Sequence, residues 1–133
     1  SIQAFEAESG ARLWGVELPR WTDFSAAGDS AGFPTRWWRG TREACLPGAS
    51  SYGVIDAQGV FWMGHLDGRL WRVKDWNQDG VIEPGTNELC STDLGAAFPT
   101  GGVTIVPGML AVATCDTLYV FKDAHAHPMA STT

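Results

Sequence analysis

An internal repeat constrains the fold of this 133-residue chain more than any other feature. Residues 53–67 align with residues 102–116 at an offset of 49, and residues 69–75 align with residues 117–123 at an offset of 48 once Gly68 is skipped. Each copy contains three short segments that are apolar or alternating, separated by turns with Gly or Asp, which is typical of successive β-strands. The alternative is a chance alignment of two hairpins of similar composition.

The length of the repeat indicates the architecture. A period of about 40 to 50 residues with four strands per unit is typical of a β-propeller blade. Residues 1–6 resemble the third strand of the repeat, and residues 11–18 follow as a fourth strand. We therefore predict an all-β fold of antiparallel β-propeller blades, about two and a quarter in number, that forms part of a larger propeller or assembly.

These predicted blades divide the chain into segments. The predicted segments are the end of one blade at 1–18, a long insertion loop at 19–50, a complete blade at 51–95, a partial blade at 96–123 and a flexible tail at 124–133. The insertion shows no helical periodicity, and a long loop in a compact domain usually carries function or packs on itself. Because an open propeller exposes unpaired strand edges, we expect other polypeptide, or self-association, to complete it.

Composition and charge exclude several classes of protein. Hydrophobic residues make up 44% and charged residues 18%, which is enough apolar material for a core and argues against a disordered tail. A net charge of −6 argues against nucleic acid as a partner. No stretch approaches the roughly 20 apolar residues of a transmembrane segment. No leader pattern opens the chain, so any signal peptide has been removed, and we expect a secreted or periplasmic protein.

The three cysteines leave the redox state open. Because the count is odd, at least one of Cys45, Cys90 and Cys115 is a free thiol or pairs between chains. None of them forms a C-x-x-C pair, which argues against structural zinc. One interpretation is a disulfide between Cys45 and Cys90 in an exported chain. The other is three buried thiols that act as small hydrophobic residues.

The most specific chemical motif is a cation-binding loop at residues 75–83. Its sequence, Asp-Trp-Asn-Gln-Asp-Gly-Val-Ile-Glu, has oxygen-bearing side chains at the first, third and fifth positions and Gly at the sixth. This spacing is typical of Ca²⁺ loops, because alternate residues of a curled loop point inward. The predicted ligands are Asp75, Asn77, Asp79, the carbonyl group of Val81, and Glu83.

Other residues define which kind of calcium loop this is. Gly80 permits a sharp turn, and Ile82 is expected to anchor the loop to the core. The twelfth position, where an EF-hand has Glu, is Thr86, so Glu83 is the expected closing carboxylate and Glu88 is a second candidate. The nine-residue form resembles the calcium hairpin loops of integrin-type propellers. Oxygen ligands favour a structural Ca²⁺; the alternative is a solvated acidic turn.

A second motif lies near the N-terminus, where residues 4–14 read Ala-Phe-Glu-Ala-Glu-Ser-Gly-Ala-Arg-Leu-Trp. This segment resembles the tryptophan-docking motif of the pyrroloquinoline-quinone-like (PQQ-like) β-propeller family, Ala-x-Asp-x-x-Thr-Gly-x-x-x-Trp. The matching residues are Ala4, Gly10 and Trp14, with Glu6 in place of Asp and Ser9 in place of Thr. The resemblance implies a turn between two strands of a blade, with Trp14 packed between adjacent blades.

The same resemblance sets two functional expectations. The PQQ-like family includes quinoprotein alcohol dehydrogenases, which hold PQQ beneath a disulfide of adjacent cysteines, and non-catalytic scaffolds. This sequence has no adjacent cysteine pair, and no catalytic residue carries over. We expect a Ca²⁺-stabilised scaffold or binding module that is not an enzyme. The alternative is a fragment of a PQQ-dependent dehydrogenase whose catalytic residues lie outside this chain.

Three weaker signals remain. Trp37 and Trp38 stand between arginines and either form a partner surface, since Trp and Arg are common anchors, or cover the core beneath the insertion. His125 and His127 lie in the predicted tail, where a frayed terminus is a simpler interpretation than a metal site. His65 follows an apolar strand and is expected to be a partly buried residue at the strand end.

Overall fold

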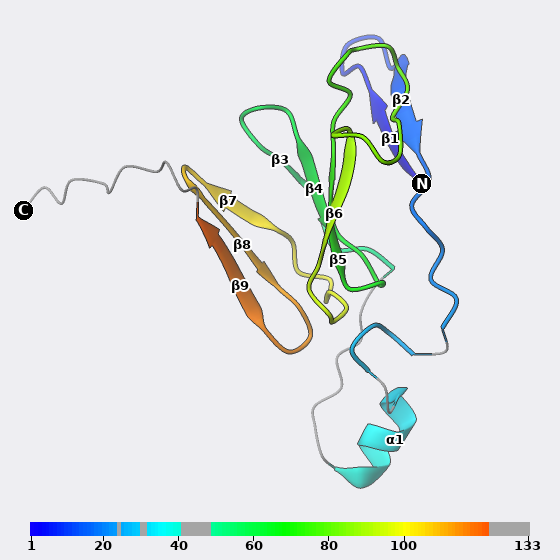
Figure 1. The fold of residues 1–133 in the computed structure, drawn as a ribbon, viewed down its shortest axis with the longest axis vertical. Helices are drawn as coiled ribbons and strands as arrows, with labels where there is room; N and C mark the ends of the chain where they lie inside the picture. Colours follow the sequence, from blue (N-terminus) through cyan, green and yellow to red (C-terminus); the bar gives the residue numbers. More distant parts are fainter. Residues whose placement is uncertain (24, 30–31, 41–48, 123–133) are drawn as a thin grey trace, which may run out of the picture.

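The computed structural model describes residues 1–23, 25–29, 32–40 and 49–122, and these residues form an all-β fold with three antiparallel sheets (Figure 1). The first sheet pairs β1 (Ile2–Phe5) with β2 (Arg12–Val16). The second sheet orders β3 (Val54–Ile55), β4 (Phe61–Gly64), β5 (Arg69–Val73) and β6 (Leu89–Asp93). The third sheet orders β7 (Thr104–Val106), β8 (Met109–Ala113) and β9 (Leu118–Lys122).

The two copies of the repeat each form the predicted three-strand unit. The first copy forms β3, β4 and β5, and the second copy forms β7, β8 and β9 at the aligned positions. Neighbouring strands pair antiparallel in both copies. The first copy is extended by β6, which pairs with β5 in the register Trp71↔Ser91. The all-β prediction is therefore confirmed. The described residues do not close into a ring.

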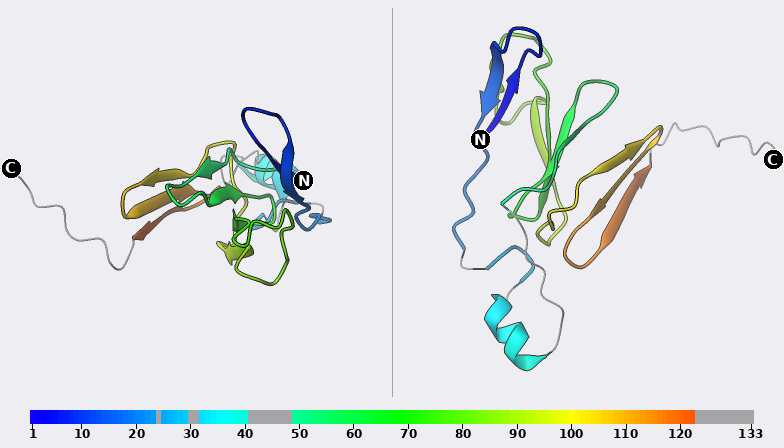
Figure 2. Two further views of the ribbon diagram at one scale, coloured as in Figure 1. Left: turned by 90° about the horizontal axis from the view of Figure 1, so that it is seen from above. Right: turned by 180° about the vertical axis from the view of Figure 1, so that it is seen from behind.

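One core cluster joins the first sheet to the second. The hairpin β1–β2 lies beside the second sheet in every view (Figures 1 and 2). The cluster consists of Val16, Trp71, Val73, Ile82 and Leu89. Trp14 is half-buried and packs against this cluster, opposite Ala4 in the hairpin. Part of the indole remains exposed, and the role of Trp14 between adjacent propeller blades stays a prediction.

A second core cluster joins the second sheet to the third. It consists of Leu70, Phe98, Val103 and Val112. Gly64 is needed at this point because a Cβ there would lie 2.3 Å from the Phe98 ring. Tyr119 packs against the same cluster, and its hydroxyl group donates to the carbonyl of Leu94 at 3.0 Å. The second sheet therefore uses one face for the hairpin before it and the other face for the sheet after it.

The insertion corrects one expectation. It contains a helix, α1 (Gly32–Arg39), so the expectation of a segment without helical periodicity is wrong. The helix has Pro34 in its first turn, where proline is tolerated. It ends at Arg39 and is followed by Gly40, which has a φ of 61° and whose N–H donates to the Trp37 carbonyl at 3.2 Å. These two residues delimit the helix.

The cysteines also differ from both expectations. Cys90 is a free thiol, so the predicted pairing of Cys45 with Cys90 is wrong. Its Sγ instead donates to the Thr86 carbonyl at 3.3 Å. Cys115 is disulfide-bonded, so the three thiols of the other interpretation are also wrong. Cys45 lies outside the described residues.

No helix within the described ranges has the length and apolar character needed to cross a bilayer.

Candidate cation-binding loop

The predicted calcium loop forms the connection from β5 to β6, and side-chain oxygens curl it. Asp75 Oδ2 accepts a hydrogen bond from the N–H of Gly80 at 2.9 Å. Asn77 Oδ1 accepts from the N–H of Asp79 at 3.0 Å, and Asp79 Oδ1 accepts from the N–H of Val81 at 2.8 Å. Gly80 has a φ of 82°, a left-handed conformation that glycine adopts without a steric penalty. The first, third and fifth positions thus belong to one turn.

One oxygen of this turn is left without a partner. Asp75 Oδ1 is buried and makes no hydrogen bond within the described part of the chain. A buried polar oxygen without a partner is destabilising, because it loses the hydrogen bonds to water that it makes in the unfolded chain and gains none in the folded protein. Asp75 therefore has one carboxylate oxygen that holds the turn and one that has no hydrogen-bond partner among the described residues.

Glu88 joins the two ends of the loop. Its side chain is 4% exposed. Oε1 accepts from the N–H of Trp76 at 3.2 Å, and Oε2 accepts from the N–H of Glu83 at 3.1 Å. The side chain of Glu83, which was the expected closing carboxylate, is exposed. Glu88 is thus the buried acid of the loop, although its position in the motif made it only the second candidate.

The loop also contacts the first sheet. Ile82 is 5% exposed and belongs to the core cluster that contains Val16 of β2, which confirms its predicted anchoring role. A Cβ on Gly80 would lie 3.2 Å from the carbonyl oxygen of Leu13. Near the start of the loop, Lys74 Nζ lies 4.0 Å from the centre of the Trp76 ring. The conformation of the loop is therefore tied to the packing of the hairpin on the second sheet.

The described residues contain no group of three or more His, Cys, Asp or Glu side chains placed to hold a metal ion. Two of the predicted ligands, the side-chain amide of Asn77 and the backbone carbonyl of Val81, are of other kinds. The loop places Asp75, Asn77 and Asp79 in one turn. It leaves the Glu83 side chain at the surface.

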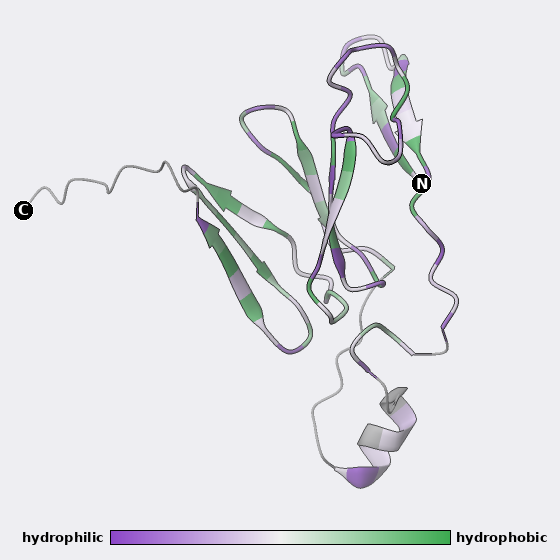
Figure 3. Cartoon of the chain, viewed as in Figure 1, coloured by the Kyte–Doolittle hydropathy of each residue, from purple (hydrophilic) through white to green (hydrophobic). Residues whose placement is uncertain are grey.

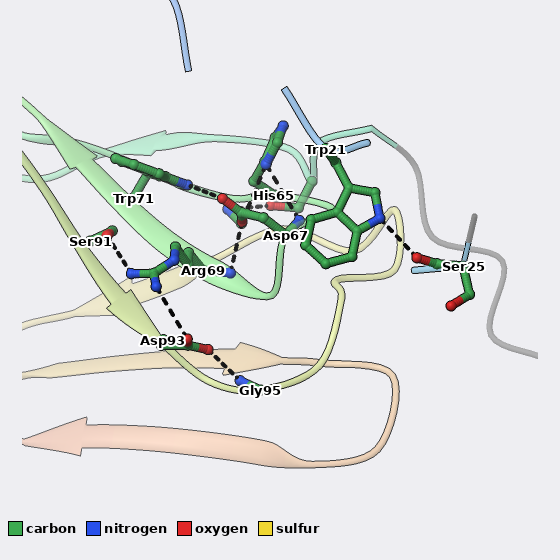
Figure 4. Close-up of polar contacts among 11 residues, drawn as sticks. Trp21, Ser25, His65, Asp67, Arg69, Trp71, Ser91, Asp93 and Gly95 are labelled. Carbon is green, nitrogen blue, oxygen red and sulfur yellow. Dashed lines mark hydrogen bonds and ion pairs between the residues drawn. The ribbon is translucent and has the colours of Figure 1, made fainter. Parts of the chain in front are cut away.

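A polar network holds the opposite end of the second sheet (Figure 4). Asp67, in the turn between β4 and β5, accepts from the N–H of Arg69 at 2.9 Å and from Trp71 Nε1 at 3.2 Å. His65 Nδ1 lies 3.2 Å from Asp67 Oδ1, and the His65 side chain is 15% exposed, which confirms its predicted partial burial. Arg69 in turn pairs with Asp93 of β6 at 3.3 Å. These contacts fix a turn and the edge pairing of the sheet.

The turn between β3 and β4 depends on Asp56. Oδ1 accepts from the N–H groups of Gln58 and Val60, each at 2.9 Å, and Oδ2 accepts from Trp62 Nε1 at 2.9 Å. Burial alone would raise the pKa of Asp56. The three hydrogen bonds, with the positive charge of Lys74, outweigh burial and hold the pKa below its ordinary value.

A groove of about 730 Å³ opens beside this turn, between the second and third sheets. Its walls are mostly apolar and include Val54, Trp62, Leu70, Ile105 and Phe121. Its size is that of a small-molecule site, but the described charged groups on its rim, Asp56 and Lys122, are few.

The other predicted residues occupy separate places. Gly10, in the docking-motif turn between β1 and β2, has a φ of 70°. Trp38 is 90% exposed and Trp37 is 72% exposed, so these two indoles do not cover the core; the partner surface stays a prediction. His125 and His127 lie outside the described residues.

Comparison of the chain with models of protein families, with curated proteins and with solved structures finds no match.

Proposed function

We propose that this chain is a calcium-stabilised segment of a β-propeller that serves as an exported, non-enzymatic scaffold or binding module. The observation that carries the proposal is the buried Oδ1 of Asp75, which has no partner in a turn made of oxygen-bearing side chains. A cation supplies what this oxygen lacks. Hard oxygen donors without His or Cys suit Ca²⁺, which takes about six to eight oxygen ligands.

The residues that would hold the ion come from one contiguous loop. Asp75, Asn77 and Asp79 supply side-chain oxygens, and Val81 supplies its carbonyl. Glu83 is the closing carboxylate of the proposal, since its exposed side chain is free of the hydrogen bonds that occupy Glu88. An ion bound there joins β5 to β6 and fixes their register, which is a structural and not a catalytic role.

Two further observations support the propeller and the exported location. The second sheet packs with one face on the hairpin and with the other on the third sheet, as a blade does inside a propeller. Cys115 is disulfide-bonded, and disulfides persist mainly in oxidising compartments. The proposal assigns no catalytic residue.

Thermal unfolding with and without Ca²⁺ tests the proposal. An ion that binds the native state alone stabilises it by about 2.7 kcal/mol at a hundredfold excess over its dissociation constant. We therefore expect the melting midpoint to rise when millimolar Ca²⁺ replaces chelator. An unchanged midpoint in a well-folded sample contradicts the calcium site.

Matched variants locate the effect. Asp75→Ala and Asp79→Ala each remove a predicted ligand and should abolish the rise in midpoint. Glu8→Gln removes one charge from an exposed residue outside the loop and should leave the rise unchanged. Incubation with PQQ and Ca²⁺ separates the alternative. A bound quinone spectrum would favour a dehydrogenase fragment over a scaffold.

A further inference from the structure

A small pocket of about 170 Å³ lies where the second sheet meets the connection from β5 to β6. Half of its lining residues are polar or charged and half are apolar or aromatic: Arg72, Lys74 and Asn87, and Val60, Val73 and Trp76. Figure 3 shows the mostly hydrophilic colouring of this connection beside the more hydrophobic strands. The pocket thus combines two positive charges with an apolar wall, and the second sheet with its own connections builds all of it.

The two basic residues of the pocket stand on one face of one strand. Arg72 belongs to β5, and Lys74 follows the last residue of that strand. The N–H of Lys74 donates to the carbonyl of Glu88 at 3.0 Å, which continues the strand pairing beyond Val73. Alternate residues of a strand point to the same face and lie about 6.6 Å apart along it. Arg72 and Lys74 therefore present their charges to the same pocket.

Neutral groups hold both cations in place. Lys74 Nζ donates to the carbonyl of Gln58 and lies 4.0 Å from the centre of the Trp76 ring. Arg72 Nη2 donates to Cys90 Sγ at 3.4 Å, and a thiol sulfur is a weak acceptor. These contacts position the two side chains, but a carbonyl, an indole ring and a thiol do not neutralise their charges.

No carboxylate is paired with these cations, although the sequence has fifteen Asp and Glu residues against nine Lys and Arg. Arg69, two residues before the pocket begins on β5, pairs with Asp93 at 3.3 Å. Within the described ranges, Arg72 and Lys74 form no ion pair. The charge of Asp56 acts on Lys74, but the Asp56 carboxylate already accepts three hydrogen bonds. The pocket therefore keeps two positive charges that a bound anion would neutralise.

We propose that this pocket binds a small organic carboxylate, with its anionic group on Arg72 and Lys74 and its apolar body against Val60 and Trp76. A guanidinium group can bind both oxygens of a carboxylate, and an ammonium group adds a compact charge. Because Lys74 is already held in place, little of its freedom is lost on binding. An inorganic ion would leave the apolar wall unused. The inference rests on the binding-module part of the proposed function and uses none of the proposed calcium ligands.

Titration calorimetry with benzoate, a compact aromatic carboxylate, tests the pocket. The buffer is freed of calcium over a resin, since soluble chelators are themselves carboxylates. We expect saturable binding of benzoate. Benzamide, its neutral counterpart of similar shape, should bind at least about tenfold more weakly, because it makes no charge-assisted hydrogen bonds. Sulfate should also bind at least about tenfold more weakly, because it buries no apolar surface.

Matched variants locate the binding site. Arg72→Gln and Lys74→Gln should each raise the dissociation constant of benzoate about tenfold or more. Arg72→Lys keeps the charge without the planar fork and should also weaken binding. Arg20→Gln is the control, because it removes one positive charge from an exposed residue outside the pocket and should change the constant less than about twofold. Circular dichroism establishes which variants are folded.

The outcomes separate this inference from the proposed calcium site. Absence of saturable benzoate binding overturns the pocket. Equal affinity for benzoate and benzamide, or for benzoate and sulfate, also overturns it, as does an equal loss of affinity in Arg20→Gln. A protein whose melting midpoint rises with Ca²⁺ but which binds no benzoate overturns the pocket alone. A protein that binds benzoate but whose midpoint ignores Ca²⁺ overturns the calcium site alone.

Discussion

The two copies of the repeat form the same three strands and bury them to very different extents. Leu70 is 3% exposed and its counterpart Leu118 is 68% exposed; Val73 is 1% exposed and its counterpart Phe121 is 37% exposed. Both leucines precede an aromatic residue on the third strand of their unit. The repeat sequence therefore specifies strands and turns, whereas the burial of a given side chain depends on which neighbouring elements cover it.

The aromatic residues that follow these leucines extend the comparison. Trp71 donates from Nε1 to Asp67 within its own turn. Its counterpart Tyr119 donates from its hydroxyl to Leu94, which belongs to the preceding unit. The first contact holds a turn and the second joins two sheets. An aligned position can thus keep its place in the strand while its polar group takes a different partner.

The largest effect on stability is expected from truncating Leu70, with its aligned counterpart Leu118 as the comparison. Leu70→Ala removes a buried side chain from the second core cluster and should lower the free energy of unfolding by about 2–5 kcal/mol. Leu118→Ala should change it by less than about 0.5 kcal/mol, because Leu118 is exposed. Urea unfolding measures both changes. Equal losses would show that burial does not distinguish the copies.

A smaller effect is expected from truncating Trp14, the hairpin residue that packs against the core cluster of the second sheet. Trp14→Ala should lower the free energy of unfolding by about 2–3 kcal/mol, below the range of a fully buried Trp, because the indole is half-buried. The same variant should expose Trp71 and so shift its fluorescence to longer wavelength. Leu13→Ala, on the opposite face of the same hairpin, is the control and should have little effect. A Trp14→Ala variant with unchanged stability would mean that the hairpin does not support the second sheet.

The smallest effect concerns a turn that only the first copy builds on a carboxylate. Asp56 aligns with Ile105, so Asp56→Asn tests a contact that the second copy lacks. The folded pKa of Asp56 lies below its unfolded value of 3.8, so its contribution is present above that pH and is lost as pH falls through the folded pKa. We expect Asp56→Asn to lower the free energy of unfolding by about 1 kcal/mol at pH 7. The difference from wild type should shrink under strongly acidic conditions, as followed by urea unfolding; a difference independent of pH would contradict this.

Sequence predicted the strands well because their signals are local. Alternating apolar residues and turns with Gly or Asp specify each strand within a few residues, as in the turn at Asp67. Helix α1 was missed because its eight residues are too few for a periodic pattern to stand out in the sequence, and its termini depend on Pro34 and Gly40. The cysteine pairing was wrong because a disulfide requires proximity in space, which spacing in the sequence does not contain.

The sequence also predicted only part of the candidate site. Counting along the motif located Asp75, Asn77 and Asp79 in one turn. It ranked Glu83 above Glu88 because position nine is closer to the known pattern. The burial of Glu88 depends on where β6 begins, at Leu89, and on the inward direction of the side chain just before it. No linear motif contains that information.

The position of Glu88 has a consequence for how the connection from β5 to β6 opens. One buried carboxylate receives the N–H groups of both Trp76 and Glu83. If the Glu88 side chain moves away, both amides lose their hydrogen-bond acceptor at the same time. The two amides therefore share one opening event, and their hydrogen–deuterium exchange should proceed at a common rate although they stand at opposite ends of the connection.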